Sequence, residues 1–229
     1  MKNKMLQKDV VKTKECYSFD TIDLAIKKAK ELSITKNLKF KESVDVAINL
    51  NLGSKQSIKG SVILPNGSGK TSRIIVLTES EEQQKLAIEA GAIMSGMDDL
   101  VLKIEEGFID FDYCIATHDA MHKISRLAKK LGPRGLMPSQ KNGTITNEVT
   151  KSVSEFLGGK VSFKSDKSGI VHCLVGKSEF DEASLTENVL AVIKVVKDLK
   201  PDNLKGRLIK SLYLKTTMGS SIKVSSDSL

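Results

Sequence analysis

The hydrophobic positions in the first quarter of the chain follow the period of a helix and then that of strands. Apolar residues recur at helical spacing over 22–32 and predict a helix there. The segment SVDVAINL (43–50) alternates apolar with other side chains, which is the pattern of a half-buried strand. A second strand is predicted over 59–65, KGSVILP, and ends at its proline.

The middle of the chain has a different pattern. RIIVLT (73–78) and YCIAT (113–117) are short, continuous apolar runs, typical of strands buried on both faces. Amphipathic stretches over 81–90, 98–106 and 120–131 predict three helices. The order strand, helix, helix, strand, helix with short connections indicates a small α/β domain around a parallel sheet.

The last third returns to strands with one apolar face. Two strands are predicted on either side of a hairpin turn at 165–169, followed by a helix over 184–200. The chain then predicts a final hairpin made of 208–216 and 221–224. Pairing these strands with those of the first quarter gives an α+β layer built from both chain ends.

The fold class is therefore α/β and α+β in two domains. A discontinuous α+β domain comprises 1–66 plus 160–229, and an α/β domain is inserted as 67–159. The charge supports this division, because 36 Lys and Arg against 28 Asp and Glu give the chain +8. The inserted segment holds 11 basic and 13 acidic residues, a net of −2, which leaves +10 for the rest. Such an excess favours a polyanionic partner, nucleic acid before membrane, although charge alone fits a merely soluble basic protein equally well.

The cysteine pattern and the hydropathy exclude several classes. Cys16, Cys114 and Cys173 are odd in number and far apart, which indicates free thiols in a reducing compartment rather than a disulfide frame or zinc ribbon. No apolar run approaches the roughly 18 residues of a membrane span. The Lys-rich first 17 residues lack the apolar segment of a secretory signal, so we expect a basic arm and a cytoplasmic location.

NGSGKT (66–71) resembles a phosphate-binding loop, but Leu64 stands where the full pattern requires its first glycine. The residues that follow are strand-like, so no helix N-terminus would face a phosphate. We interpret Gly67 and Gly69 as a hinge between the domains, with Gly158 and Gly159 at the second crossing.

His118 and His122 have the i, i+4 spacing of a zinc motif, but a zinc site needs a third ligand. Cap and surface histidines are the preferred interpretation, with no metal and no cofactor. Apart from these weak matches, the sequence offers no catalytic constellation.

Two loops are more distinctive. LGPRGLMP (131–138) places two glycines and two prolines around Arg134, directly after a basic helix. The tip of the last hairpin, TTMGSS (216–221), combines hydroxyls with a glycine. Hydroxyls and exposed amides suit the 2′-hydroxyls and phosphates of RNA, and glycine allows close approach.

Together these features resemble the bacterial ribosomal protein L-one family, the stalk protein of the large subunit. The matching stretches follow the family's order: KFKESVDVAINL (39–50), KGSVILPNGSGK (59–70), FIDFDYCIATHDAM (108–121), LGPRGLMP (131–138), FKSDKSGIVHCLVGK (163–177) and YLKTTMGSSIKV (213–224). Two departures are a short segment over 51–56 and Ser139-Gln140 in place of Asn-Pro.

The resemblance implies a split RNA-binding domain with an inserted Rossmann-like, three-layer α/β domain. It implies a non-enzymatic constituent of the large ribosomal subunit that binds large-subunit rRNA, forms the mobile stalk beside the exit site and assists release of deacylated tRNA. The implied partners are that rRNA, exit-site tRNA and the mRNA of its own operon, whose translation it would repress; no membrane is involved, and the free protein is a monomer. The RNA-binding residues implied are Lys39, Phe40, Glu42, Ser43, Asp166, Lys167, Ser211, Thr216, Thr217, Met218 and Gly219, with secondary contacts at Arg134 and Lys141.

Two alternatives remain at this point. One is a nucleotide-using enzyme built on the inserted α/β domain. The other is a free translational repressor with little role in the ribosome.

Overall fold

The computed structural model describes residues 17–19, 21–34, 39–53, 56–201, 204 and 206–225. The predicted basic arm, except for its last residue, and Cys16 lie outside these residues. Contacts divide the chain into two compact units, and the fold is mixed α/β with several sheets. The first unit comprises Met1–Ile58, Leu64–Ser68 and Phe163–Leu229, and the second comprises Lys59–Ile63 and Gly69–Ser162.

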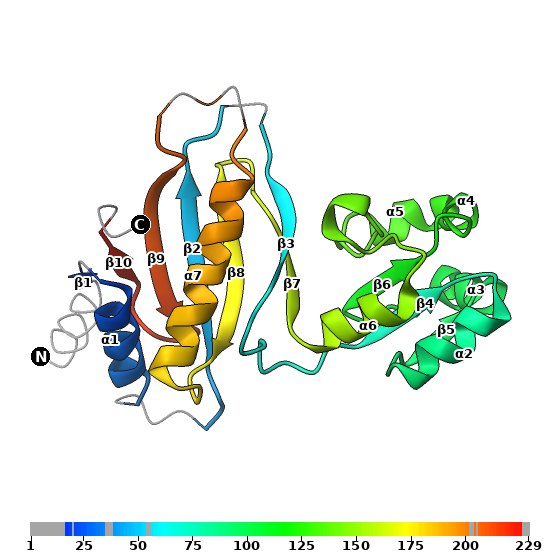
Figure 1. The fold of residues 1–229 in the computed structure, drawn as a ribbon, viewed down its shortest axis with the longest axis horizontal. Coiled ribbons are helices and arrows are strands. Elements are labelled where there is room, and N and C mark those ends of the chain that lie inside the picture. Colours follow the sequence, from blue (N-terminus) through cyan, green and yellow to red (C-terminus); the bar gives the residue numbers. More distant parts are fainter. Residues whose placement is uncertain are drawn as a thin grey trace, which may run out of the picture. The chain divides into compact units, whose positions relative to one another are not determined.

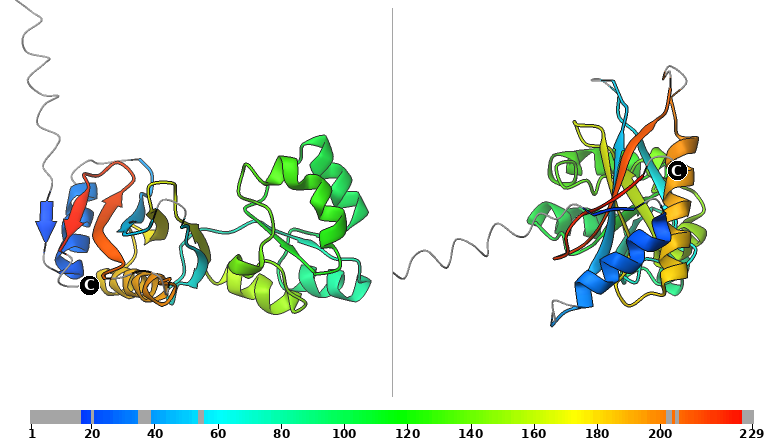
Figure 2. Two further views of the ribbon diagram at one scale, coloured as in Figure 1. Left: turned by 90° about the horizontal axis from the view of Figure 1, so that it is seen from above. Right: turned by 90° about the vertical axis from the view of Figure 1, so that its left-hand side faces the viewer.

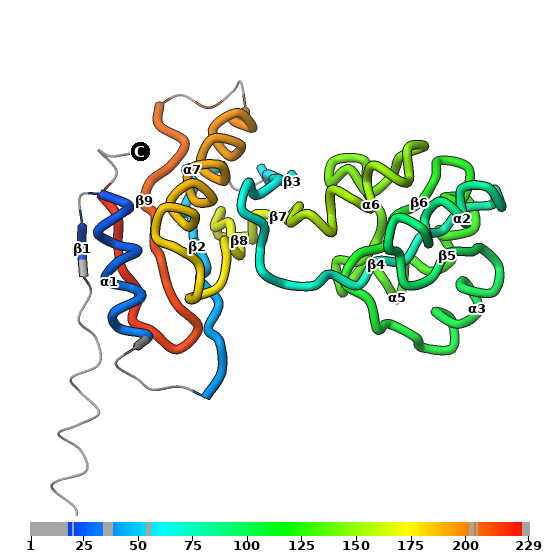
Figure 3. Tube along the Cα trace, turned by 60° about the horizontal axis from the view of Figure 1, so that its bottom comes forward, coloured from blue at the N-terminus to red at the C-terminus, as the bar shows by residue number. Residues whose placement is uncertain are grey.

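The first unit is built on a five-stranded sheet from both ends of the chain (Figure 1). Its order is β1 (Tyr17–Phe19), β10 (Ile222–Val224), β9 (Ile209–Thr216), β2 (Ser43–Leu50) and β8 (Ile170–Lys177). β1 runs parallel to β10, and the other neighbours are antiparallel. The prediction that early strands pair with late ones is confirmed, and Figure 3 shows the blue and red ends of the chain side by side in this unit.

Alternation along these strands gives the sheet one covered and one open face. In β2 every second residue from Val44 to Leu50 is buried, as the sequence pattern predicts. Two helices, α1 (Ile22–Ile34) and α7 (Glu182–Asp198), contact each other and the strands on the covered side (Figure 2). The other residues of the strands form what we call the open face: Ser43, Asp45, Ala47, Asn49, Ile170, His172, Leu174, Ser211, Tyr213 and Lys215.

The second unit contains the predicted parallel sheet. Its order is β5 (Met94–Gly96), β4 (Ile74–Leu77) and β6 (Tyr113–Ala116). Ile75 and Leu77 of β4 join one apolar cluster with α3 (Asp98–Glu106) and the segment that holds α4 (Met121–Ile124), η1 (Ser125–Leu127) and α5 (Ala128–Leu131). Ile74 and Val76 point the other way, toward α2 (Glu81–Glu89) and α6 (Val149–Leu157). Helices therefore cover both faces of this sheet.

Two sequence predictions about elements are wrong in detail. The single helix over 120–131 is divided, because η1 interrupts it where the Ser125 hydroxyl donates to the Met121 carbonyl at 2.9 Å. The strands around 165–169 are β7 (Lys160–Lys164) and β8, and the predicted turn between them is present, since the Asp166 N–H donates to the Ile170 carbonyl at 2.9 Å and Ser165 forms an isolated antiparallel bridge with Val171. Beyond that bridge the two strands do not pair with each other. β7 pairs instead with β3 (Lys59–Ile63), while β8 pairs with β2.

The chain passes between the contact-defined units near the predicted hinges. Gly69 begins the long segment of the second unit, whereas the other division falls between Ser162 and Phe163, beyond Gly158 and Gly159. The strand β3 also groups with the second unit, although the sequence places it in the discontinuous domain. The two domains as independently folding parts stay a prediction.

Candidate RNA-binding surface

The connection between β9 and β10, residues 217–221, forms a tip that is hydrogen-bonded to the start of β2. The Thr217 N–H donates to the Ser43 carbonyl at 3.1 Å, and the Ser43 N–H donates to Thr217 Oγ1 at 3.1 Å. The Lys177 ammonium also donates to the Ser43 hydroxyl at 3.3 Å. The tip is therefore held in one conformation before any ligand arrives, which lowers the entropic cost of binding.

Glu42 supports the tip from inside. Its side chain is only 1% exposed, and its Oε1 accepts the Met218 N–H at 2.7 Å. Its Oε2 accepts the hydroxyl of Ser33, which comes from the last turn of α1. The resemblance implied that Glu42 contacts RNA, but its carboxylate is buried and points inward. Glu42 therefore positions Met218 and is not accessible to a ligand.

Gly219 is required for space rather than for a left-handed backbone. It is not among the glycines with positive φ, but a Cβ at this position would collide with the Thr216 hydroxyl. Thr216 is itself 1% exposed, and its Oγ1 has no hydrogen-bond partner among the described residues. Thr216 therefore lies beneath the tip instead of on its surface.

Two large apolar side chains are exposed at this same end of the sheet. Phe40 is 51% exposed and lies two residues before Glu42, and Met218 is 54% exposed and is bonded to Glu42 through its backbone. Lys39 is exposed beside them. Exposed apolar groups next to a cation and to ordered backbone amides form a surface that can contact sugars and bases as well as phosphates.

The other predicted RNA-binding residues of the first unit lie near the end of β2 that is away from the tip. The Asp166 carboxylate accepts the N–H groups of Ser168 at 2.9 Å and Ile170 at 2.8 Å, which fixes a turn with Lys167 exposed. Within this turn, the carbonyl of Gly169 accepts the N–H of Leu50, the last residue of β2.

Ser211 lies across from Asn49, also toward this far end of β2. At roughly 3.3 Å per residue, the turn is about 20 Å from the tip, measured along β2. The predicted sites thus form two groups joined by the open face, and sequence reasoning missed the face between them.

The predicted secondary contacts belong to the second unit. Arg134 is exposed in a turn closed by a hydrogen bond from Gly135 N–H to the Gly132 carbonyl at 3.1 Å. Lys141 is exposed in η2 (Gln140–Asn142). Both side chains are available to solvent in their own unit.

The Gly-rich loop does not have the surroundings of a nucleotide site. No helix follows it, since β4 begins at Ile74, and Lys70 forms an ion pair with Asp112 at 2.7 Å. Burial raises the pKa of the Asp112 carboxyl, but hydrogen bonds from Lys70 and from the Arg73 backbone outweigh it, so the pKa falls below its ordinary value. The loop lysine is thus neutralised by a carboxylate that stays ionised.

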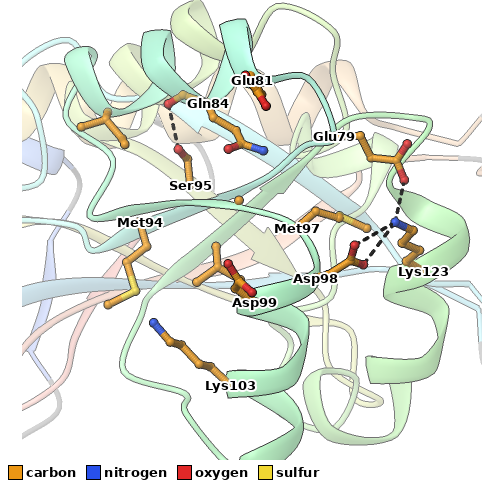
Figure 4. A pocket seen from close by; sticks show the side chains of 13 residues that line it. Glu79, Glu81, Gln84, Met94, Ser95, Met97, Asp98, Asp99, Lys103 and Lys123 are labelled. Atoms are coloured by element: carbon orange, nitrogen blue, oxygen red, sulfur yellow. Dashed lines mark hydrogen bonds and ion pairs between the residues drawn. The ribbon is translucent and has the colours of Figure 1, made fainter.

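A pocket of about 700 Å³ lies where β4 and β5 end, which is the usual ligand edge of a parallel sheet (Figure 4). Four carboxylates line it, and its Lys123 is paired with Glu79 at 3.2 Å and with Asp98 at 3.1 Å. The other carboxylates are Glu81 and Asp99, against a second lysine, Lys103. This excess of negative charge opposes the binding of phosphates and weakens the interpretation as a nucleotide-using enzyme.

His122 is exposed in α4, and His118 is exposed in the turn before this helix. In the part of the chain that the structure describes, no three potential ligands come together around a metal position. Burial raises the pKa of the Cys114 and Cys173 thiols to about 12, so both are unreactive at neutral pH. None of the described helices is long and apolar enough to cross a membrane.

Comparison with known proteins identifies the family. Residues 26–220 match the model of the Ribosomal protein L1p/L10e family, and this chain belongs to that family. A protein of Thermobifida fusca named large ribosomal subunit protein uL1 is 50% identical over 161 residues, covering 70% of this chain and 68% of its own length. A protein of the same name from Mycolicibacterium gilvum is 47% identical and covers 70% of this chain and 67% of its own length. A third, from Bifidobacterium longum, is 45% identical and covers 72% of this chain and 72% of its own length. The resemblance inferred from the sequence motifs is confirmed.

Proposed function

We propose that this protein is a structural, non-catalytic constituent of the large ribosomal subunit and binds large-subunit rRNA through its first unit. The observation that carries the proposal is the tip, whose amides and hydroxyl are fixed against Ser43 and Glu42 on the sheet edge. Family membership and the printed name of the relatives support the same role. Its location is then the cytoplasmic ribosome.

Two kinds of contact contribute to binding, one to specificity and the other to general affinity. Structured RNA is read by shape, backbone and 2′-hydroxyls, so the preformed tip with Phe40 and Met218 selects the site. Exposed lysines such as Lys39 and Lys167 add sequence-independent attraction to phosphates. Glu42, Ser43 and Thr216 hold the tip in place.

The finer parts of the role also belong to this proposal. The two predicted domains, 1–66 plus 160–229 and a Rossmann-like 67–159, move relative to each other at Gly69, Gly158 and Gly159. Gly67, the fourth predicted hinge residue, is held to helix α7, because its carbonyl accepts a hydrogen bond from Asn188 at 3.1 Å. Through the second domain, with Arg134 and Lys141, the protein forms the stalk near the exit site and assists release of deacylated tRNA. The same RNA-binding surface represses its own mRNA, and the free protein is a monomer.

Sedimentation of cell extracts through sucrose gradients tests the proposal. We expect the wild-type protein to sediment with the large subunit and a Gly219→Val variant to remain near the top, because the added side chain displaces the tip. Leu190→Ser on the exposed side of α7 is the matched control and should sediment like the wild type. Wild-type protein found entirely at the top of the gradient would favour the free repressor instead.

A further inference from the structure

A hollow of about 520 Å³ lies on the open face of the first unit's sheet. Its lining comes from the three neighbouring strands β9, β2 and β8, which Figure 1 shows side by side. Asp45, Val46 and Ala47 line it from β2, with Ala47 at the end away from the tip. The residues directly opposite Ala47 are Tyr213 on β9 and His172 on β8. At this end of the hollow a methyl group stands between two ring-bearing side chains.

The spacing of the strands gives this hollow the width of a slot for one flat ring. Neighbouring strands are about 4.8 Å apart, so β9 and β8 lie roughly 9.6 Å apart on either side of β2. Side chains stand nearly perpendicular to a sheet, so Tyr213 and His172 form the two walls and Ala47 forms the floor. A stacked base needs about 3.4 Å on each side, or about 7 Å between two flanking rings, so one base fits between the walls.

The end of the slot nearer the tip is polar and charged. Asp45 and Lys215 are opposite each other in the next row of the sheet, so they offer a hydrogen-bond acceptor and a donor beside the ring position. Thr217 of the tip also lines the hollow, and Lys223 lies opposite Tyr213 on its other side. The slot is thus continuous with the tip and flanked by cations, which suits a polyanion that presents bases.

We propose that the slot receives one unpaired base of the RNA, turned out of its helix and stacked between Tyr213 and His172. The proposal rests on the proposed function, since it names how the same surface selects its RNA. Splayed bases stacked on Tyr or His, with polar groups at their edges, are a general mode of RNA recognition. Seven Phe, three Tyr and no Trp exclude rows of stacked bases, but a single slot needs only one or two rings.

The test compares variants of the full chain in binding to large-subunit rRNA transcribed from the same organism's gene. Ala47→Ile fills the floor with a residue that suits a strand, Tyr213→Leu keeps bulk but removes the ring, and Tyr213→Phe restores the ring. We expect the first two to bind about 10-fold more weakly, the typical effect of losing one stacked base, and Tyr213→Phe to bind like the wild type. Leu190→Ala on α7 is the control and should change nothing.

Chemical probing of base edges in the same complexes identifies the base itself. One unpaired nucleotide should be protected by the wild type and become reactive with Ala47→Ile and Tyr213→Leu, while the rest of the footprint stays. Unchanged affinity, or weaker binding with no change at any single unpaired base, would overturn the slot. If circular dichroism shows that Ala47→Ile does not fold, the comparison of rRNA binding by Tyr213→Leu and Tyr213→Phe tests the slot by itself. If the wild type does not bind the rRNA, or if Gly219→Val binds it as tightly as the wild type does, the proposed function is overturned instead.

Discussion

At the scale of single residues, the neighbouring hydroxyls of Thr216 and Thr217 have opposite situations. Thr217 is exposed and exchanges hydrogen bonds with Ser43, whereas Thr216 is buried and its hydroxyl has no partner among the described residues. A buried hydroxyl without a partner costs free energy, because water is lost and nothing replaces it. The sequence shows only two adjacent threonines, and the fold gives them different roles.

Thr216→Val should therefore raise the free energy of unfolding by about 1 kcal/mol, since it removes an unsatisfied polar group without changing shape much. Thr217→Val should change stability less, because water can replace an exposed acceptor, but it should weaken rRNA binding. Urea unfolding and filter binding of both variants measure the two effects. The assignment fails if Thr216→Val is the less stable of the pair.

Asp45 makes the first unit sensitive to pH. Burial raises the pKa of its carboxyl above the ordinary 3.8, and the charges of three neighbours oppose this only in part: His172, Lys177 and Lys215. A raised pKa in the folded state means that folding favours the protonated form. Stability therefore rises as pH falls through the folded-state pKa, and the gain is complete below 3.8.

Asp45→Asn should accordingly be more stable than the wild type at neutral pH, and this advantage should shrink as the wild type becomes protonated. Thermal unfolding of both proteins between neutral pH and about pH 4 measures the difference. A constant difference across that pH range would show that Asp45 does not titrate as stated.

At the scale of elements, helix α7 fixes the segment 64–68 to the first unit. The buried Asn188 donates to the carbonyls of Val175 at 2.7 Å and Gly67 at 3.1 Å, and its Oδ1 accepts the N–H of Asn66 at 3.1 Å. One side chain thus satisfies three backbone groups from two segments. The flexible part of any hinge therefore starts after Gly67.

Asn188→Leu should lower the free energy of unfolding by about 2–4 kcal/mol, since it leaves buried backbone groups without partners. Asn66→Ala, which removes only exposed side-chain bonds, should cost under about 1 kcal/mol. Amide hydrogen exchange at residues 66–68 should accelerate in the first variant and change little in the second. Equal exchange in both would mean that other contacts hold the segment.

At the scale of the whole molecule, the distribution of charge indicates which part binds RNA. The net charge is +10 outside 67–159 and −2 inside it. With the contact-defined bounds, which move Lys59 and Lys160 into the second unit, the first unit carries +8 and the second is neutral. The acidic pocket at the edge of the parallel sheet agrees with that contrast. Phosphate attraction is additive over nearby cations, so the first unit should hold most of the affinity.

A chain in which a short Gly-Ser linker replaces residues 69–162 should thus retain rRNA binding to within about 100-fold, or roughly 3 kcal/mol. Circular dichroism first establishes that the shortened chain is folded. Filter binding across a salt series then compares it with the full chain. A folded but non-binding product would mean that the second unit is a principal RNA contact.

The hydrophobic pattern by itself determined most elements and their grouping. Strand 43–50, the helices beginning at 81 and 98 and the last hairpin follow from periods of 2 and 3.6, because burial on one side imposes those periods. The family also followed from sequence, since LGPRGLMP and TTMG are local strings that need no tertiary information. The three-residue strand β5 and the divided helix after Ala120 were not predictable, because so short a strand has no period and a single 3₁₀ turn barely changes the spacing of apolar residues along a helix.

The tertiary structure alone decided how the candidate site works. Glu42 and Thr216 are polar in the sequence, yet the fold buries both, since the tip closes over them. The alignment of Tyr213, Ala47 and His172 depends on the register of three strands, and Ala47 is more than 100 residues from the other two residues in the chain. Register is fixed by which faces can be buried together, a property of the assembled sheet that no local pattern contains.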